Sequence, residues 1–355
     1  MMNKSNPSRS WRPWLIAGIV TVLLAGILFF IPVPYYVFQP GSALEVGPMV
    51  HVEKLSYREK GSFLLTTVAV REGNIYGYLA GQWNPEIELV PKKEVLGEGE
   101  NSREYYERQE KVMKQSEENA VIAAFRTAGR PVKVKTVGVE VFRTLEKMPA
   151  QGVLQKGDLI QRIDGQQVET AEELVKKLWD RKPGDQVRVT FLRKGKVKTR
   201  TLRLAVLNGE ERGIKRAGIG VVPVTKRKVE TDPRVQVDAE RIGGPSAGLM
   251  FTLEIMNQLL SKDLTHGHRI AGTGTITPDG EVGQIGGVQH KIVAADKAGA
   301  EVFFVPADTH PFDQNEKLAK ATVKRIGSNM KVVPVHDVKE AVRFLDSLSR
   351  VKKAA

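Results

Sequence analysis

Residues 243–260 read GGPSAGLMFTLEIMNQLL, and this stretch decides the fold of the second half of the chain. Its large apolar residues recur at steps of three and four, the spacing of one buried helix face: Leu249, Leu253, Met256 and Leu260. Pro245 precedes them, in the first turn, where a helix tolerates proline. We therefore predict a buried helix that begins at the glycines and carries Ser246 at its N-terminus.

Ser246 stands between small residues, with Gly244 and Pro245 before it and Ala247 after it. A serine at this position is often no more than an N-cap. The same position exposes the hydroxyl to unpaired backbone N–H groups and to the positive end of the helix dipole, and both stabilise a developing oxyanion. We consider Ser246 a candidate nucleophile, with the simple cap as the alternative.

A second glycine turn opens GGVQHKIVAA at residues 286–295, where small and apolar residues follow Lys291. A lysine that serves as a general base near neutral pH needs a pKa roughly three units below the usual value of about 10.4, which corresponds to about 4 kcal/mol. Burial can lower a lysine pKa by that amount. A neutral Lys291 beside Ser246 would form a serine–lysine dyad that attacks amide carbonyls.

The GGPSAG motif and residues 271–306, AGTGTITPDGEVGQIGGVQHKIVAADKAGAEVFFVP, resemble the proteolytic domain of the Lon family. The resemblance implies an α/β (α+β) fold, with Ser246 and Lys291 as the catalytic dyad. It also implies that Thr273 holds the lysine, and that Gly244, Pro245 and Ala247 support the serine. The family has an aspartate where this chain has Gly243.

Residues 101–129 predict a long helix that begins with a capping box at Asn101 and Glu104 and stops at Gly129. Its segment VMKQSEENAVIAAFR resembles the first long helix of the Lon proteolytic domain. We therefore expect residues 46–129 to be the front of this domain and residues 207–349 its catalytic part.

Residues 130–206 change to short strands and tight turns at Asp164-Gly165 and Lys194-Gly195, with a helix opened by Thr170. The segment LQKGDLIQRIDGQQVETAEELVKKL resembles the sequence of a PDZ domain. This domain would be an insertion in the Lon-like part. Such domains bind an extended peptide by strand addition beside a helix. The resemblance suggests a peptide-binding loop at Val137, Gly138 and Val139.

Residues 14–31 carry no charge and are almost long enough to cross a bilayer of about 30 Å. Three basic residues precede this run without any acidic one: Lys4, Arg9 and Arg12. The positive-inside rule then keeps residues 1–13 in the cytoplasm and places the rest outside. We expect a single-pass signal anchor in the cell membrane; a cleaved signal peptide is the alternative, although no small-x-small cleavage site follows.

Composition and missing motifs narrow the class of function. The net charge of +13 suits an anionic surface, but only 6% of the residues are aromatic, which argues against a nucleic-acid partner. No G-x-x-x-x-G-K-[ST] or H-E-x-x-H motif occurs, so we predict neither ATP nor metal, and His266 and His268 are read as loop residues. The absence of cysteine excludes thiol catalysis. A triad of Ser246, His290 and Asp296 is a further alternative.

Together, these features resemble the membrane-anchored PDZ and Lon-like serine peptidases of Gram-positive bacteria, which lack the ATPase module. The resemblance implies an ATP-independent endopeptidase that acts on extracytoplasmic peptides or unfolded proteins, needs no cofactor and can assemble into a ring of identical subunits. The alternative function is a membrane-tethered PDZ scaffold with an inactive Lon-like domain.

Overall fold

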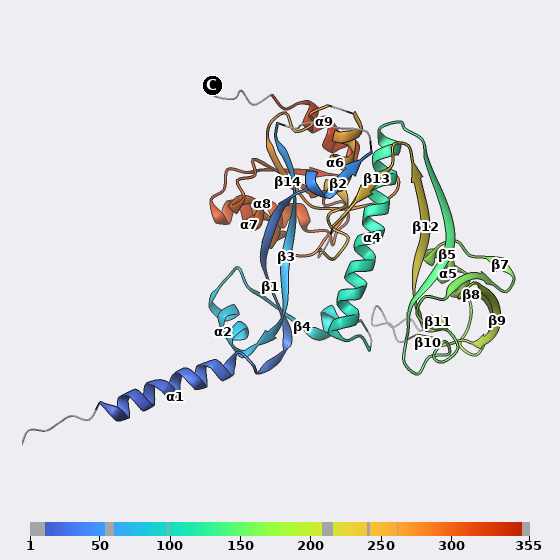
Figure 1. Cartoon of the computed structure of the whole chain (residues 1–355), viewed down its shortest axis with the longest axis horizontal. Helices are drawn as coiled ribbons and strands as arrows, with labels where there is room; N and C mark the ends of the chain where they lie inside the picture. The colour runs from blue at the N-terminus through green and yellow to red at the C-terminus, as the bar shows by residue number, and fades with distance from the viewer. Residues whose placement is uncertain are drawn as a thin grey trace, which may run out of the picture.

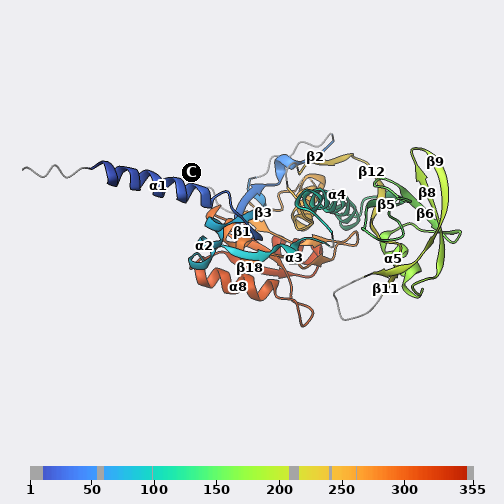
Figure 2. The ribbon, with the colours of Figure 1, turned by 90° about the horizontal axis from the view of Figure 1, so that it is seen from below.

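The computed structural model describes residues 11–349, apart from 54–59, 98, 208–215, 240–241 and 261. Figure 1 shows a large domain built around a mixed sheet, a smaller β-rich domain beside it, and a helix, α1, that leaves the large domain at the opposite end. The long helix α4 (Ser102–Thr127) stands between the two domains (Figures 1 and 2).

The sheet of the large domain has the strand order β18-β17-β14-β3-β1-β4. Its strands are β1 (Pro32–Glu45), β3 (Ser62–Asn74), β4 (Glu88–Pro91), β14 (Arg269–Gly272), β17 (Val302–Pro306) and β18 (Lys331–Val335). Strand β14 pairs in parallel with both β3 and β17. The sheet therefore joins segments that come before and after the small domain in the chain.

Helices cover both faces of this sheet. Successive side chains of a strand point to opposite sides, so neighbouring residues of β3 belong to different cores. Phe63 and Leu65 of β3 belong to a core with α4, α6 (Gly248–Leu260) and α9 (Val338–Asp346). Leu64 belongs to a second core with α7 (Val288–Lys297) and α8 (Asn315–Ile326). The large domain is thus a layered α/β structure, as predicted.

Both helices that were predicted around the serine motif are present. Helix α6 is buried along almost its whole length, which confirms a buried helix after the serine motif, but it begins at Gly248 and not at the glycines before Ser246. Helix α4 begins with the predicted capping box, since the Asn101 side chain accepts from the Glu104 amide and the Glu104 side chain accepts from the Asn101 amide. These two helices pack against each other in the core.

The small domain has the strand order β12-β5-β6-β8-β9, and a short strand β7 pairs with β6. Its elements are β5 (Val132–Thr144), β6 (Leu159–Ile163), β7 (Gln166–Gln167), α5 (Ala171–Trp179), β8 (Gln186–Arg193), β9 (Lys196–Arg203) and β12 (Val221–Thr231). The predicted turns at Asp164-Gly165 and Lys194-Gly195 are confirmed, and α5 is capped by Thr170 as predicted.

One strand of this sheet lies beyond residue 206, where the PDZ domain was predicted to end. Strand β12 pairs with β5 over its full length, from Val221 opposite Thr144 to Thr231 opposite Val132. The sheet of the small domain therefore continues to Thr231. The charged segment after residue 206 contains no turn signal strong enough to show this pairing in the sequence.

Short elements complete the described part of the chain: η1 (Gly47–Met49), β2 (Val50–Val52), α2 (Ile75–Trp83), α3 (Lys92–Val95), β10 (Ala205–Leu207), β11 (Arg216–Gly218), β13 (Val235–Val237), β15 (Thr275–Ile276) and β16 (Val282–Gly283). Strands β15 and β16 pair across the turn that was predicted at 278–280.

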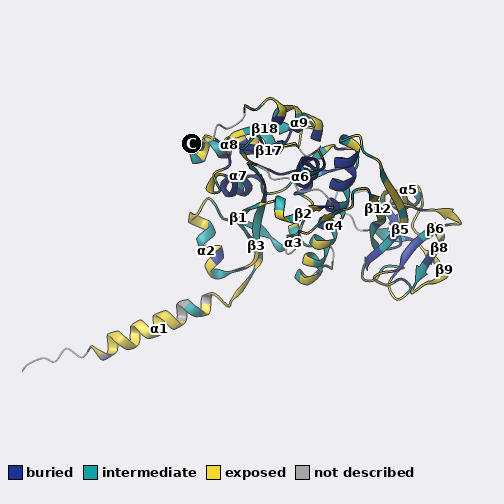
Figure 3. Ribbon diagram, turned by 45° about the horizontal axis from the view of Figure 1, so that its top comes forward, coloured by how far each residue is buried: buried dark blue, intermediate teal, exposed yellow. Residues whose placement is uncertain are grey.

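The apolar N-terminal run forms α1 (Arg12–Leu28). At 1.5 Å per residue, this helix is roughly 26 Å long. None of the helices in the described ranges has the length and apolar character that crossing a membrane requires. Figure 3 shows most of α1 as exposed, away from the rest of the protein.

Candidate active site

Ser246 lies in the loop that leads into α6, two residues before the helix begins at Gly248. Helix α4 holds this loop at two points. The Gln109 carbonyl accepts a 3.0 Å hydrogen bond from the Gly244 amide, and the Ser116 hydroxyl donates a 2.9 Å bond to the Pro245 carbonyl. Gly244 has a φ of +88°, a conformation that favours glycine. Pro245 stands ahead of the helix and not in its first turn.

The structure brings Lys291 of α7 to this loop. Its Nζ atom lies 2.5 Å from Ser246 Oγ and 3.0 Å from Thr273 Oγ1. Thr273 directly follows β14, and its hydroxyl lies 3.1 Å from the Ser246 carbonyl oxygen. Three segments that are distant in the sequence, namely the α6 loop, the end of β14 and α7, therefore converge on one amine.

Lys291 is 3% exposed. Burial lowers the pKa of its ammonium group from 10.5 to about 7, because removal of water disfavours the charged form. Its two hydrogen-bond partners in the site, Ser246 and Thr273, are neutral hydroxyls, so no carboxylate among them opposes this shift. A large fraction of the Lys291 side chains is thus neutral at physiological pH.

A groove of about 940 Å³ opens beside this pair. Its walls come from β1, β3, β4, α4, the serine loop and the glycine turn before α7, and they include Leu44, Leu65, Val68, Val90, Met113 and Ile242. Ser246 and Lys291 both line the groove. The mixture of apolar walls and backbone from three strands suits an extended polypeptide.

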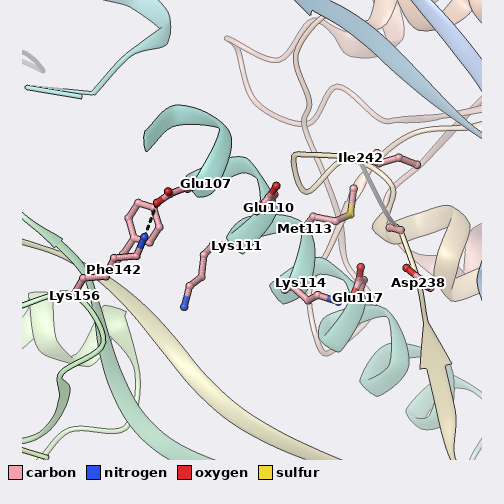
Figure 4. Close-up of a pocket in the computed structure, with 11 residues that line it drawn as sticks. Glu107, Glu110, Lys111, Met113, Lys114, Glu117, Phe142, Lys156, Asp238 and Ile242 are labelled. Atoms are coloured by element: carbon pink, nitrogen blue, oxygen red, sulfur yellow. Dashed lines mark hydrogen bonds and ion pairs between the residues drawn. The ribbon is translucent and has the colours of Figure 1, made fainter. Parts of the chain in front are cut away.

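A second cavity, of about 540 Å³, lies along α4 between the large and the small domain. Figure 4 shows Glu107, Lys111 and Lys114 of α4 on one side of it, and Phe142 and Lys156 of the small domain facing them. Met113 and Ile242 line this cavity as well as the groove. The two spaces therefore adjoin at Met113 and Ile242.

The predicted supporting residues Gly244, Pro245 and Ala247 flank Ser246 in the loop before α6. Gly243, which precedes them, lies against α4. A Cβ atom at this position would stand 2.8 Å from the Gln109 Cβ atom of α4. Gly243 does not have a left-handed backbone, so only this contact requires glycine. Ala247 is buried. The close approach of α4 to the loop therefore leaves little room for a side chain at residue 243.

The alternative triad is not assembled. His290 Nε2 contacts Glu88 Oε2 of β4 at 3.1 Å, and Asp296 is exposed on α7. The His268 ring contacts Glu301 and the Ser349 carbonyl. Among the residues the structure describes, no group of three His, Cys, Asp or Glu side chains is arranged to hold a metal ion.

The prediction of a loop at Val137–Val139 is wrong. These residues lie inside β5, and Val139 pairs with Thr225 on one side and with Ile160 on the other. The strand order of this sheet ends at β12 on one side and at β9 on the other, and β12 is the edge that lies beside α5. A small apolar pocket lies between β12 and α5, and Leu174, Leu178, Ile219 and Val221 line it.

Gly218, Ile219 and Gly220, which precede β12 and line this pocket, were not among the predicted residues. They have the glycine-hydrophobic-glycine pattern that the 137–139 stretch lacks. Gly220 has a φ of +77°, and a Cβ atom there would stand 2.1 Å from Met148. The pattern was visible in the sequence, but it fell beyond the domain boundary that was predicted at residue 206.

Family models match both domains. A PDZ domain model matches residues 112–204, and a model of the Lon protease (S16) C-terminal proteolytic domain matches residues 233–346. The Lon protease of Metamycoplasma arthritidis is 35% identical over 102 residues, which cover 29% of this chain and 11% of the relative. The Lon protease of Clostridium acetobutylicum is 34% identical over 95 residues, 27% of this chain and 11% of the relative. The chain thus matches about a tenth of the length of these relatives.

Solved PDZ structures are also similar. The PDZ domain of the SdrC-like protein of Listeria monocytogenes is 30% identical and covers 26% of this chain and 93% of that chain, with a TM-score of 0.24. The corresponding domain from Listeria innocua is 30% identical and covers 24% of this chain and 92% of that chain, with a TM-score of 0.22. The sequence matches to the family models define the two parts: the chain contains a PDZ domain and a C-terminal proteolytic domain of the Lon type.

Proposed function

We propose that this protein is a serine endopeptidase in which Ser246 is the nucleophile and Lys291 the general base. One observation carries the proposal: a buried amine whose pKa is about 7 lies 2.5 Å from a serine hydroxyl in a groove. The match to the Lon proteolytic domain supports a serine peptidase. The proposed reaction uses no ATP and no cofactor.

In the first half of the reaction, Ser246 Oγ attacks the carbonyl carbon of the scissile amide while the neutral Lys291 amine takes the hydroxyl proton. The C–O bond forms, and the carbonyl oxygen becomes an oxyanion near the positive end of α6. The protonated Lys291 then gives the proton to the amide nitrogen as the C–N bond breaks. The amine product leaves, and an ester of Ser246 remains.

In the second half, a water molecule gives a proton to Lys291 and attacks the ester carbonyl. When the tetrahedral intermediate collapses, the proton returns from Lys291 to Ser246 Oγ and the acid product leaves. Thr273 positions the amine through its 3.0 Å hydrogen bond throughout both halves. The proton balance closes, because one water molecule is consumed and Ser246 and Lys291 return to their starting forms.

The substrates are peptides or unfolded proteins that lie extended in the groove. We assign peptide recognition by the PDZ domain to the space between α5 and the free edge of β12, with Gly218, Ile219 and Gly220 at its end. The apolar pocket there and the unpaired edge of β12 support strand addition. Assembly of identical subunits into a ring stays a prediction. Sedimentation of the full chain measures the number of subunits.

We further propose that residues 14–31 insert into a lipid bilayer and place the two domains outside the cytoplasm. The uncharged run and the three basic residues before it support this topology. Extraction of cell membranes with alkaline carbonate measures whether the chain is inserted in the bilayer. Release of the full chain into the soluble fraction would contradict insertion and would leave the peptidase proposal untouched.

The peptidase test uses the full chain with casein and a random peptide mixture, without ATP, and identifies new N-termini by mass spectrometry. We expect Ser246→Ala and Lys291→Ala to abolish cleavage while thermal unfolding stays cooperative. Lys297→Ala is the matched control, since this lysine lies near the exposed end of the same helix. Full turnover by Lys291→Ala, or binding of peptides without any cut by the unaltered chain, would refute the proposal and favour a binding module.

A further inference from the structure

Helix α2 presents an unusual surface to solvent. Three of its large side chains are strongly exposed, with 81% for Trp83, 51% for Tyr76 and 42% for Leu79, and Tyr78 is 36% exposed. Tyr76, Leu79 and Trp83 lie on one side of the helix, at steps of three and four, and we call these three residues the aromatic face of α2. Single exposed apolar residues are normal in soluble proteins, but a group of them on one short helix marks an interaction surface.

The aromatic face is tied to the end of α1. The Asn74 side chain, which caps α2, donates a 2.9 Å hydrogen bond to the Phe29 carbonyl. The Ile75 amide donates a 3.2 Å bond to the Ile31 carbonyl. The rings of Phe29 and Tyr76 stack with their centroids 4.6 Å apart. These contacts place the start of α2 at the level where the apolar N-terminal run ends.

The end of that run is itself exposed, with 50% for Phe29, 86% for Phe30 and 40% for Ile31. Along α1, exposed apolar side chains lie on several sides of the helix, among them Trp14, Ile16, Ile19, Val22 and Leu23. A helix that is apolar on all sides requires apolar surroundings. The apolar environment that α1 requires therefore extends to the aromatic face of α2.

We propose that the aromatic face of α2 lies in the headgroup region of a lipid bilayer and docks the proteolytic domain on the membrane surface. Tyrosine and tryptophan favour this region, because their rings are apolar and their O–H and N–H groups stay hydrated. The proposal rests on the proposed insertion of residues 14–31, which sets the depth: Phe29 to Ile31 reach the outer boundary, and the hydrogen bonds from Asn74 and Ile75 hold α2 there.

The arrangement of the whole chain agrees with this orientation. Helices α1 and α2 lie at one end of the molecule, and the PDZ domain lies at the other end (Figures 1 and 2). Strand β4 follows α2 in the chain and borders the groove. Its Glu88 accepts hydrogen bonds from Gln289 and His290, next to Lys291. Docking through α2 therefore holds the groove at a fixed distance from the lipid surface.

The test is depth-dependent fluorescence quenching of the full chain in vesicles of phosphatidylcholine and phosphatidylglycerol that contain lipids brominated near the headgroup. The chain has four tryptophans, Trp11, Trp14, Trp83 and Trp179, and three are replaced by phenylalanine in each variant. The first variant retains Trp83. The second retains Trp14 as a reporter of α1. The third retains Trp179, which is 54% exposed on the PDZ domain, as the matched control.

We expect the shallow bromines to quench Trp83 several-fold more strongly than Trp179. Quenching of Trp14 without quenching of Trp83 would overturn the role of α2 and leave the insertion of α1 intact. Failure of both to respond would overturn insertion as well. Trp83 emission could also be unquenched by the brominated lipids and shift to shorter wavelength as the protein concentration rises. This result would show that a second copy of the chain covers this face, and it would overturn the proposal. Peptide cleavage, measured on the same samples, reports the catalytic proposal separately.

Discussion

The Ser116 hydroxyl donates a 2.9 Å hydrogen bond to the Pro245 carbonyl, the residue before the candidate nucleophile. This bond joins α4 to the serine loop across 129 positions of sequence. Because Gln109 of the same helix accepts from Gly244, α4 is a rigid support for the loop.

Ser116→Ala should therefore impair catalysis more than folding. A lost hydrogen bond of this kind costs about 1 kcal/mol of stability, whereas a loop that moves loses the alignment of Ser246 with Lys291. We expect kcat to fall at least several-fold, as measured with a fluorogenic peptide. Ser102→Ala is the control, since Ser102 on the same helix bonds Tyr36 far from the loop. Equal activity of the two variants would contradict this role of α4.

The rate should depend on pH through Lys291. The active form is the neutral amine, and its pKa is about 7. Catalysis should therefore rise with pH from 6 to 8 and level off once most of the amine is deprotonated. The measurement is kcat/KM across this range. A profile that falls over the same range would mean that the active form of the enzyme is protonated, and this would exclude Lys291 as the general base.

Lys291 should also make the fold less stable. Its pKa is lower in the folded than in the unfolded chain, so the unfolded chain binds more protons between pH 7 and 10.5 and stability rises with pH there. Lys291→Met removes a desolvation cost of about 5 kcal/mol and loses two hydrogen bonds of about 1 kcal/mol each. We expect a net gain below pH 7 that shrinks toward pH 10, as measured by thermal unfolding. Lys297→Met should leave stability nearly unchanged, and a less stable Lys291→Met variant would disagree with this account.

Gly243→Asp introduces the residue that the resemblance to the Lon family leads one to expect. Its Cβ would meet the Gln109 Cβ at 2.8 Å, so α4 and the loop must separate. We expect loss of peptide cleavage. The double variant with Gln109→Gly removes the opposing atom and should restore part of the activity. No recovery in the double variant would show that the side chain at this position is harmful for another reason.

The PDZ domain should depend on a buried ion pair. Arg193 donates two hydrogen bonds, of 2.7 and 2.5 Å, to the Asp158 carboxylate, which is almost fully buried. Asp158→Asn leaves the guanidinium without its charge partner and should destabilise the domain by about 3 kcal/mol. Asp164→Asn, whose partner Arg181 is half-exposed, is the control. Similar unfolding temperatures for both variants would argue against this difference.

Sequence patterns revealed the candidate site where the signal was local. Ser246 and Lys291 each follow a glycine turn that opens a helix, and the apolar residues after Lys291 indicated its burial. The supports from α4 left no such signal, because Ser116 and Gln109 act across more than a hundred residues and their own neighbourhood is an ordinary helix. Hydrogen bonds of this range depend on how helices pack, and periodicity does not report packing.

In the PDZ domain, local sequence patterns predicted the turns and the helix cap but not the order of the strands. Its turns and its helix cap followed from dipeptides and from Thr170, but the identity of the free strand edge did not. Val137–Val139 and β12 are both rich in valine, and only the pairing of β12 with β5 shows which strand lies at the edge. Strand order depends on long-range contacts, so local composition could not distinguish the two.

The parallel pairing of β3 with β14 has a consequence for biosynthesis. On the ribosome, β3 emerges long before its neighbour, and the entire PDZ segment is made in between. Ser246 and Lys291 are both made after the PDZ segment, Ser246 before β14 and Lys291 after it. The proposed dyad is therefore complete only once Lys291 has been made, after the PDZ segment has had time to fold, and a product that terminates before Lys291 would lack the proposed general base.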